Sequence, residues 1–157
     1  MRYDLHRADG PVAVNWVPHE GLRPKTSALR FAATGPGPWK AYWVADGDGM
    51  NCAGLKWLTF YIKGDASQEL NVHLMDHHRV GEDALMDEPH YSAPVPLIAG
   101  GYLKAVTAAY QKVRIPLEKL LPKGTYFLRW HTAGFGLSAP EGARPATYHV
   151  DLIQVEP

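Results

Sequence analysis

The sequence lacks the residues and motifs on which many enzyme sites depend. Cys52 is its only cysteine, so the chain can form neither an internal disulfide nor a multi-cysteine zinc site. We expect Cys52 to be a small buried side chain and not a reactive thiol. The sequence contains no G-x-S-x-G elbow, no P-loop and no dinucleotide-binding fingerprint. Hydrolases, nucleotidases and dehydrogenases that depend on those motifs are therefore excluded.

An excess of one charge and long apolar runs are lacking as well. The 16 Lys and Arg residues balance 16 Asp and Glu residues, and the sequence pI is about 7.1. No field of one sign attracts a nucleic acid or an anionic membrane. Apolar runs fall far short of the roughly 20 residues that span a bilayer, and we expect no signal peptide at residues 1–4, which are mostly polar. We expect neither nucleic acid nor membrane as a partner.

The remaining composition is that of one folded domain. Hydrophobic residues make up 46% of the chain and charged residues 20%, which is typical of a globular protein and not of a disordered one. A chain of 157 residues is close to the usual size of one domain. We therefore predict a single domain over residues 1–157.

Short alternating segments predict an all-β fold. The 13 prolines and 15 glycines divide the chain into pieces that suit strands and turns better than helices. In residues 57–63, Leu58, Phe60 and Ile62 fall on one face, as a half-buried strand requires. The predicted strands are 12–17, 28–33, 40–45, 57–63, 70–75, 111–117, 126–130, 134–138 and 148–155. Such a series favours a two-sheet antiparallel β-sandwich, or jelly roll.

Three local features refine this prediction. The strands 57–63 and 70–75, which are consecutive and separated by a turn at Gly64-Asp65, could pair as neighbours. Pro116 lacks a ladder donor, so it marks the end or the edge of a strand. Residues 118–121 predict a short helical turn, and residues 103–110 a loop or short turn.

The aromatic residues are the feature most informative about function. Five Trp and eight Tyr outnumber four Phe, so rings with a polar group dominate, as they do at half-wet surfaces. Strand alternation places Tyr42 on the face opposite to Trp39 and Trp43, so at least one of these rings is expected to face solvent. Sugar rings are bound by such aromatic platforms together with charged or amide side chains that form directional hydrogen bonds. The sequence supplies both kinds of group.

Metal sites and catalytic carboxylates have weaker support. The densest group of possible metal ligands is His73, Asp76, His77, His78, Glu82 and Asp83. Its spacing matches no known motif, and a solvated loop is the alternative interpretation. Residues 46–51 resemble the start of a calcium loop, but Trp57 stands where an EF-hand needs its glutamate, which excludes an EF-hand. A carboxylate pair for glycoside hydrolysis is left open by Glu82, Asp83, Asp87 and Glu88.

The order of several segments resembles a known family. They are D-G-D at 46–48, W-L-T-F-Y-I-K at 57–63, L-N-V-H-L-M-D at 70–76, Y-Q-K-V-R-I-P-L at 110–117 and Y-H-V-D-L-I-Q-V at 148–155. Over roughly residues 28–155 this series resembles the galactose-binding-like jelly rolls of carbohydrate-binding modules, most closely the family 11 modules. The resemblance implies a sandwich whose concave face binds β-glucan chains, often with a structural calcium ion. It also implies a module of a larger carbohydrate-active protein, extracellular or periplasmic.

The resemblance extends to particular residues. The segment after I-P-L contributes polar and aromatic groups to the family's cleft, which implies roles for Arg129, Trp130 and His131. The loop before the H-Y segment contributes an acid, which implies Asp87 with Tyr91 behind it. The sequence departs from the family at residues 134–138, where the family has cleft-facing His and Tyr. The family's acidic N-terminal calcium signature is also missing, so Glu20 and Asp151 are the metal candidates.

The leading hypothesis is a noncatalytic module that binds a polysaccharide, with no catalytic residue assigned. The candidate ligand-binding residues are Trp39, Tyr42, Trp43, His73, Asp87, Tyr91, Arg129, Trp130 and His131. One alternative is a polysaccharide lyase or hydrolase that uses His73, His131 or a carboxylate as base. The other is a structural β-sandwich that buries its aromatic residues against a neighbouring domain.

Overall fold

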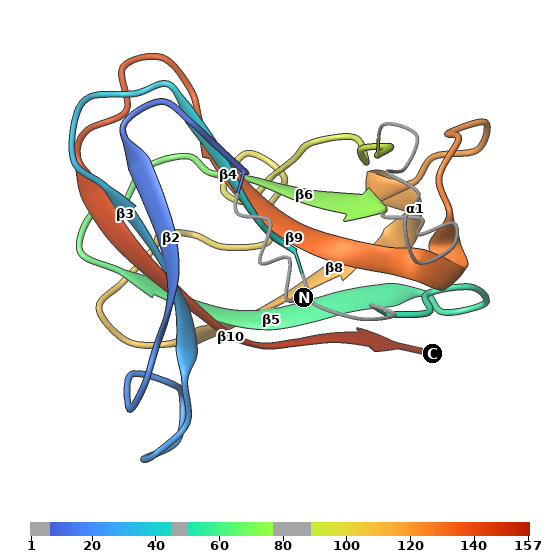
Figure 1. Ribbon diagram of the computed structural model, residues 1–157, viewed down its shortest axis with the longest axis horizontal. Coiled ribbons are helices and arrows are strands. Elements are labelled where there is room, and N and C mark those ends of the chain that lie inside the picture. Colours follow the sequence, from blue (N-terminus) through green and yellow to red (C-terminus); the bar gives the residue numbers. More distant parts are fainter. Residues whose placement is uncertain (1–6, 45–49, 77–88) are drawn as a thin grey trace, which may run out of the picture.

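The fold is a sandwich of two antiparallel sheets (Figure 1). The computed structural model describes residues 7–44, 50–76 and 89–157. Sheet A has the order β1-β4-β9-β6-β7, and sheet B has the order β2-β3-β10-β5-β8. The strands are β1 (Arg7–Asp9), β2 (Val12–Val17), β3 (Ala28–Ala33), β4 (Trp39–Val44), β5 (Trp57–Gly64), β6 (Asn71–Asp76), β7 (Val95–Pro96), β8 (Gln111–Pro116), β9 (Thr132–Ala139) and β10 (Ala146–Glu156). The predicted jelly-roll sandwich is confirmed.

The core lies between the sheets and follows from the alternation in the sequence. In β5, Leu58, Phe60 and Ile62 are completely buried, while in β6 the inward residues are Val72 and Leu74. Each such side chain contributes roughly 1.5–3 kcal/mol when it leaves water. Cys52 is also completely buried and hydrogen-bonded, as expected from the sequence. The inward sides of the strands therefore form one apolar layer.

The predicted pairing of strands 57–63 and 70–75 is wrong. β5 lies in sheet B between β10 and β8, whereas β6 lies in sheet A between β9 and β7. The two consecutive strands thus belong to opposite layers. Alternation specifies which side of a strand is apolar, and that requirement is met equally well by pairing or by facing across the core.

The predicted strand at 126–130 is also wrong. The chain there forms no ladder, and it ends in a 3-10 turn at Arg129–His131. The backbone N–H of Leu128 donates to the carboxylate of Asp76 (2.8 Å) and so is not available to a neighbouring strand. Residues 126–130 also lack the period-two pattern that marks the genuine strands.

The predicted helical turn, loop and strand end are all present, whereas the two shortest strands were not predicted. The helical turn expected at 118–121 is present as α1 (Leu117–Leu120), and residues 103–110 form no helix. Pro116 ends β8, an edge strand, as predicted. The sequence did not predict β1 and β7, because strands of three and two residues are too short to show a periodic pattern. Within the described ranges, no helix is long and apolar enough to cross a membrane.

Candidate functional site

The candidate site is built on the outer face of sheet A, the face that points away from the core. Strand register places its side chains in cross-strand rows. These rows are Lys40–Ser138–Asn71, Tyr42–Gly136–His73 and Val44–Gly134–Met75, each running from β4 across β9 to β6. The intervening positions, such as Trp43, Phe135 and Leu74, point the other way.

Two glycines in the central strand β9 let neighbouring side chains lie flat on this face. A Cβ atom at Gly136 would come within 2.5 Å of Cδ1 of Tyr42, and one at Gly134 within 2.9 Å of Cβ of Met75. Contacts this short do not occur, so larger residues there would displace the neighbours. Gly136 therefore leaves room for the ring of Tyr42 on β4, and Gly134 leaves room for the side chain of Met75 on β6.

Aromatic rings and one cation gather above these glycines. The ring of Tyr42 lies 5.8 Å from the ring of His73 and 5.4 Å from that of Tyr91, measured between centroids. The ammonium group of Lys40 lies 5.4 Å from the centroid of Tyr42 and 5.5 Å from that of Tyr91. Both distances are within the range of a cation–π interaction. The register and these contacts bring three of the predicted ligand-binding residues together: Tyr42, His73 and Tyr91.

Two members of this group, Tyr42 and His73, are shielded from solvent. Tyr42 and His73 are buried, whereas Tyr91 is 39% exposed. Burial, and secondarily the charge of Lys40, lowers the pKa of His73 to about 4, so its ring is neutral near pH 7. Its Nε2 is hydrogen-bonded to the hydroxyl of Ser138 (2.7 Å). Burial likewise raises the pKa of Tyr42, with a smaller contribution from Tyr91.

A buried carboxylate joins two further segments to this face. Asp76, at the end of β6, is 1% exposed. Its carboxylate accepts hydrogen bonds from the backbone N–H of His90 (2.6 Å) and from Nδ1 of the His90 imidazole (2.8 Å). It also accepts one from the backbone N–H of Leu128 (2.8 Å). Asp76 thereby holds the segment that carries Tyr91 beside the segment that carries Tyr126.

Three exposed rings lie on these two segments and in the 3-10 turn that follows the second one; they are Tyr91, Tyr126 and Trp130, which we call the exposed aromatic group. Tyr126 is 72% exposed and packs edge-on against the ring of His90, with 4.6 Å between centroids. Trp130 is 50% exposed and lies in the 3-10 turn. Large rings that stay this exposed in a folded domain are a common feature of ligand-binding surfaces.

The other predicted ligand-binding residues have different locations. Trp39 is buried in the core, where its ring lies 6.3 Å from that of Tyr148. Trp43 points to the inner side of sheet A and meets Trp16 edge to face at 5.5 Å. The guanidinium of Arg129 donates to the carbonyl of Leu121 (3.1 Å).

The two remaining candidate ligand-binding residues are His131 and Asp87. His131 closes the 3-10 turn that begins at Arg129. Asp87 lies outside the described residues. The eight candidates within the described residues lie on the outer face of sheet A, in the adjoining 3-10 turn, in the core and on the inner side of sheet A, and do not form one cleft.

Sequence reasoning missed Lys40, His90 and Tyr126 as members of the site. Strand alternation could have placed Lys40 beside Tyr42, because the two lie two residues apart on one strand face. His90 and Tyr126 are far apart in the sequence, and their rings meet where Asp76 binds both His90 and the backbone of Leu128. No local pattern could have found that contact.

The proposed metal-ligand cluster is not assembled from the described residues. Asp76 is bound by N–H donors, and His73 by Ser138, whereas His77, His78, Glu82 and Asp83 lie outside the described residues. Within residues 7–44, 50–76 and 89–157, no three His, Cys, Asp or Glu side chains are placed to hold a metal ion.

The two calcium candidates do not fit a calcium ion as they are arranged. The carboxylate of Asp151 accepts the backbone N–H groups of Leu22 (2.7 Å) and Leu152 (2.7 Å). Glu20 is paired with Nε2 of His149. Calcium takes six to eight oxygen ligands, and N–H donors directed at a carboxylate occupy the positions that an ion needs. Calcium stays a prediction of the family resemblance.

Solved structures reveal where this fold occurs. No protein-family profile matches the sequence, and no curated protein matches it. A family 30 carbohydrate-binding module of a Clostridium thermocellum cellulase has a TM-score of 0.70 and 16% identity, over 98% of this chain and 91% of that one. The chain has the fold of carbohydrate-binding modules.

Two other structures share this fold. The family 11 module from Clostridium thermocellum, in complex with a β-1,3-1,4-mixed-linked tetrasaccharide, has a TM-score of 0.62 and 12% identity over 96% of this chain and 86% of that one. An exo-β-agarase has a TM-score of 0.58 and 13% identity over 97% of this chain but 23% of that one. The resemblance to carbohydrate-binding modules is confirmed, with higher TM-scores for family 30 modules than for the family 11 modules that the sequence suggested.

Proposed function

We propose that this chain is a noncatalytic module that binds a polysaccharide along the outer face of sheet A. The observation that carries the proposal is the exposed aromatic group, Tyr91, Tyr126 and Trp130, on a carbohydrate-binding-module fold. Aromatic rings stack on the C–H faces of sugars, while Lys40 and His90 supply polar groups beside Tyr91 and Tyr126. Two of these rings are placed by the same buried carboxylate, Asp76.

The ligand that we propose to test first is a β-glucan. The family 11 module with the same fold was solved in complex with a β-1,3-1,4-mixed-linked tetrasaccharide. An extended glucan is bound by several aromatic platforms, and we propose that the three exposed rings Tyr91, Tyr126 and Trp130 serve as such platforms. We propose further that the chain works as one module of a larger carbohydrate-active protein, as the sequence resemblance implies.

The chemistry of the face is poorly suited to catalysis. A general base works best when its pKa is near the working pH, and the pKa of His73 is lowered to about 4. The same ring is buried and hydrogen-bonded to Ser138. Asp76 is saturated by N–H donors. These two groups hold the architecture together and are not positioned to transfer protons to a ligand.

Affinity electrophoresis in gels that contain soluble glycans tests the proposal. We expect mixed-linkage β-glucan to retard the protein, with no reducing ends released from the same glycan in solution. Tyr126→Ala should weaken binding several-fold, because a stacking contact of about 1 kcal/mol is lost. The ring is 72% exposed, so the melting temperature should be unaltered.

Trp16→Ala is the matched control, because Trp16 is also half-exposed but lies on β2 of sheet B. It should bind glycan as well as the wild type. Release of reducing ends would indicate an enzyme, and the absence of retardation on every glycan would favour a structural sandwich. Equal losses in both variants would remove the site from the outer face of sheet A.

A further inference from the structure

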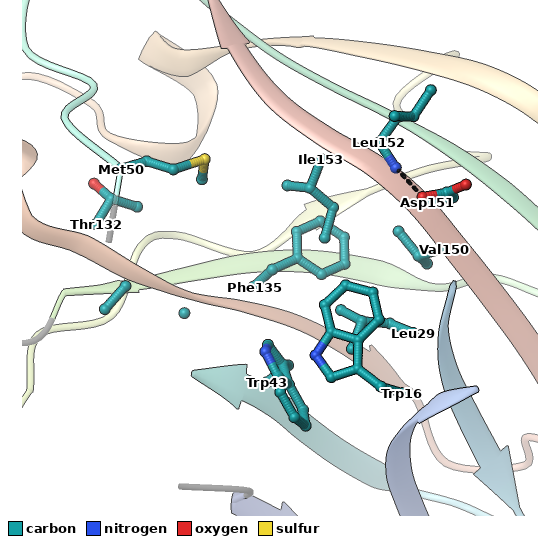
Figure 2. Close-up of a pocket in the computed structure, with 12 residues that line it drawn as sticks. Trp16, Leu29, Trp43, Met50, Thr132, Phe135, Val150, Asp151, Leu152 and Ile153 are labelled. Carbon is teal, nitrogen blue, oxygen red and sulfur yellow. Dashed lines mark hydrogen bonds between the residues drawn. The ribbon is translucent and has the colours of Figure 1, made fainter. Parts of the chain in front are cut away.

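A separate pocket opens on the inner side of sheet A, between the two sheets. Its volume is about 320 Å³, near the lower end of the roughly 300–1,000 Å³ that is usual for ligand pockets. Figure 2 shows Trp16 and Trp43 on one side, Phe135 near the centre and Ile153 facing it. The pocket therefore draws its walls from both sheets and shares no residue with the exposed aromatic group.

The pocket has a structural cause in β10. The register between β10 and β5 shifts between Asp151 and Gln154, so a bulge interrupts the ladder there. Leu152, within the bulge, has a φ of 50°, a conformation that non-glycine residues seldom adopt. The carboxylate of Asp151 accepts the N–H of Leu152 and fixes this bend. The wall is thus built by a specific backbone arrangement and is not a loosely packed edge.

The hydroxyl and the carboxylate of the lining are already hydrogen-bonded within the protein. The hydroxyl of Thr132 donates to the carbonyl of Arg129 (3.2 Å) and is hydrogen-bonded to Sγ of Cys52 (3.0 Å). The carboxylate of Asp151 is occupied by backbone N–H groups, including that of Leu22. A sugar in this pocket would bury hydroxyl groups without partners, which is unfavourable. The lining therefore selects against sugars and ions.

The apolar side chains around the pocket are only partly buried. Trp16 is 47% exposed, and Trp43, Met50, Leu152 and Ile153 are half-buried. A contiguous apolar surface beside a concavity marks an interaction site more often than scattered exposed residues do. The indoles of Trp16 and Trp43 meet edge to face at 5.5 Å, a geometry that a further aromatic ring can extend.

We propose that this pocket binds a small uncharged aromatic molecule, at a site separate from the polysaccharide surface. The two indoles supply ring contacts, Phe135 and Leu29 form a buried apolar floor, and the volume suits one substituted ring. The proposal does not depend on the proposed function, because it uses the other face of sheet A.

Titration of the ¹⁵N-labelled protein with p-cresol, observed by NMR, tests the proposal. Each of the five tryptophans carries one indole N–H group, which serves as a separate probe. We expect saturable shifts for Trp16 and Trp43, and no shifts for Trp57 and Trp130. Cellobiose, titrated in parallel, should leave the signals of Trp16 and Trp43 in place.

Two variants locate the site. Trp16→Ala should weaken p-cresol binding about fivefold or more, since it removes one ring contact. Trp130→Ala, which removes another half-exposed tryptophan, should bind p-cresol like the wild type. Ile153→Trp, which fills the pocket from the opposite wall, should abolish p-cresol binding. Melting curves confirm that each variant is folded.

Four results would overturn the proposal: no saturable shift up to the solubility of p-cresol, equal shifts at all tryptophans, unchanged binding in Trp16→Ala, or shifts of Trp16 and Trp43 with cellobiose but not with p-cresol. The last result would make the pocket a second sugar site. Glycan retardation of the same proteins is read independently, so a failure here leaves the proposed function intact, and the reverse also holds.

Discussion

The two sheets each contain a buried aspartate that holds distant backbone, yet the two differ in what they hold. Asp76 in sheet A accepts N–H groups of His90 and Leu128, and the segments that it joins carry Tyr91 and Tyr126. Asp151 in sheet B accepts the N–H of Leu22 and of its neighbour Leu152. The same chemistry therefore organises a candidate ligand surface in one sheet, whereas in the other it holds backbone N–H groups and the hydroxyl of Thr26.

The surrounding histidines extend this contrast. His73 on sheet A is buried beside the cation Lys40, and both burial and that charge lower its pKa. His149 on sheet B also has a pKa that burial lowers, but its hydrogen bond to Glu20 acts in the opposite direction. Sheet A should thus be the more acid-sensitive of the two, and the comparison can be tested by breaking each element in turn.

The largest expected effect comes from Asp76→Asn. The asparagine leaves one of the buried N–H donors without an acceptor, and its amide N–H₂ group points at a second N–H donor. The free energy of unfolding should therefore fall by about 3 kcal/mol. Because the segments of Tyr91 and Tyr126 are released, glycan retardation should also fall sharply. Urea denaturation and affinity electrophoresis measure the two effects.

Asp151→Asn is the matched control for this prediction. It should lower the free energy of unfolding by about 1–2 kcal/mol, because a carboxylate with two backbone donors is replaced by an amide. Glycan retardation should be unaffected. Loss of retardation in this variant, or retention in Asp76→Asn, would show that the two aspartates do not divide structure and binding as proposed.

The next largest effect is the loss of folding stability at low pH, which we attribute to His73. The pKa of His73 is 6.5 in an unfolded chain and about 4 in the folded protein, so the unfolded state gains the proton first as the pH falls. The stability that neutral His73 contributes is complete above pH 6.5 and is lost progressively down to about pH 4. Between pH 7.5 and pH 5 the loss should be about 2 kcal/mol, measured as the difference in urea stability.

Two substitutions assign that loss to one histidine. His73→Gln keeps a hydrogen-bonding group opposite Ser138 and removes the titration, so it should flatten the pH dependence. His149→Gln should leave most of it in place. A pH dependence that survives His73→Gln unchanged would place the acid sensitivity elsewhere in the chain.

The smallest effect should be that of chelation. Because backbone N–H groups occupy the Asp151 carboxylate, EDTA should shift the melting temperature by about 1 °C or less. A clear drop on chelation that added calcium reverses would instead support the calcium ion that the family resemblance implies. It would also show that the loop around Leu22 can rearrange to admit the ion.

The sequence predicted most of the strands because their signal is local. In β5 the apolar residues alternate, and the residues predicted to point inward, such as Phe60 and Ile62, are completely buried. The predicted strand 126–130 failed because its backbone N–H at Leu128 is claimed by Asp76, a contact that no local pattern contains. The pairing of β5 with β6 failed for a related reason, since either sheet accepts a strand with one apolar face.

For the candidate site, the sequence by itself determined the aromatic residues and their faces: alternation separates Tyr42 from Trp43 whatever the topology. Only the tertiary structure decided which of them meet. It buried Trp39 in the core, turned Trp43 toward Trp16 in sheet B, and brought Tyr126 to His90 through Asp76. These contacts join residues far apart in the chain, so they depend on which sheet each strand enters, and strand period carries no information about that choice.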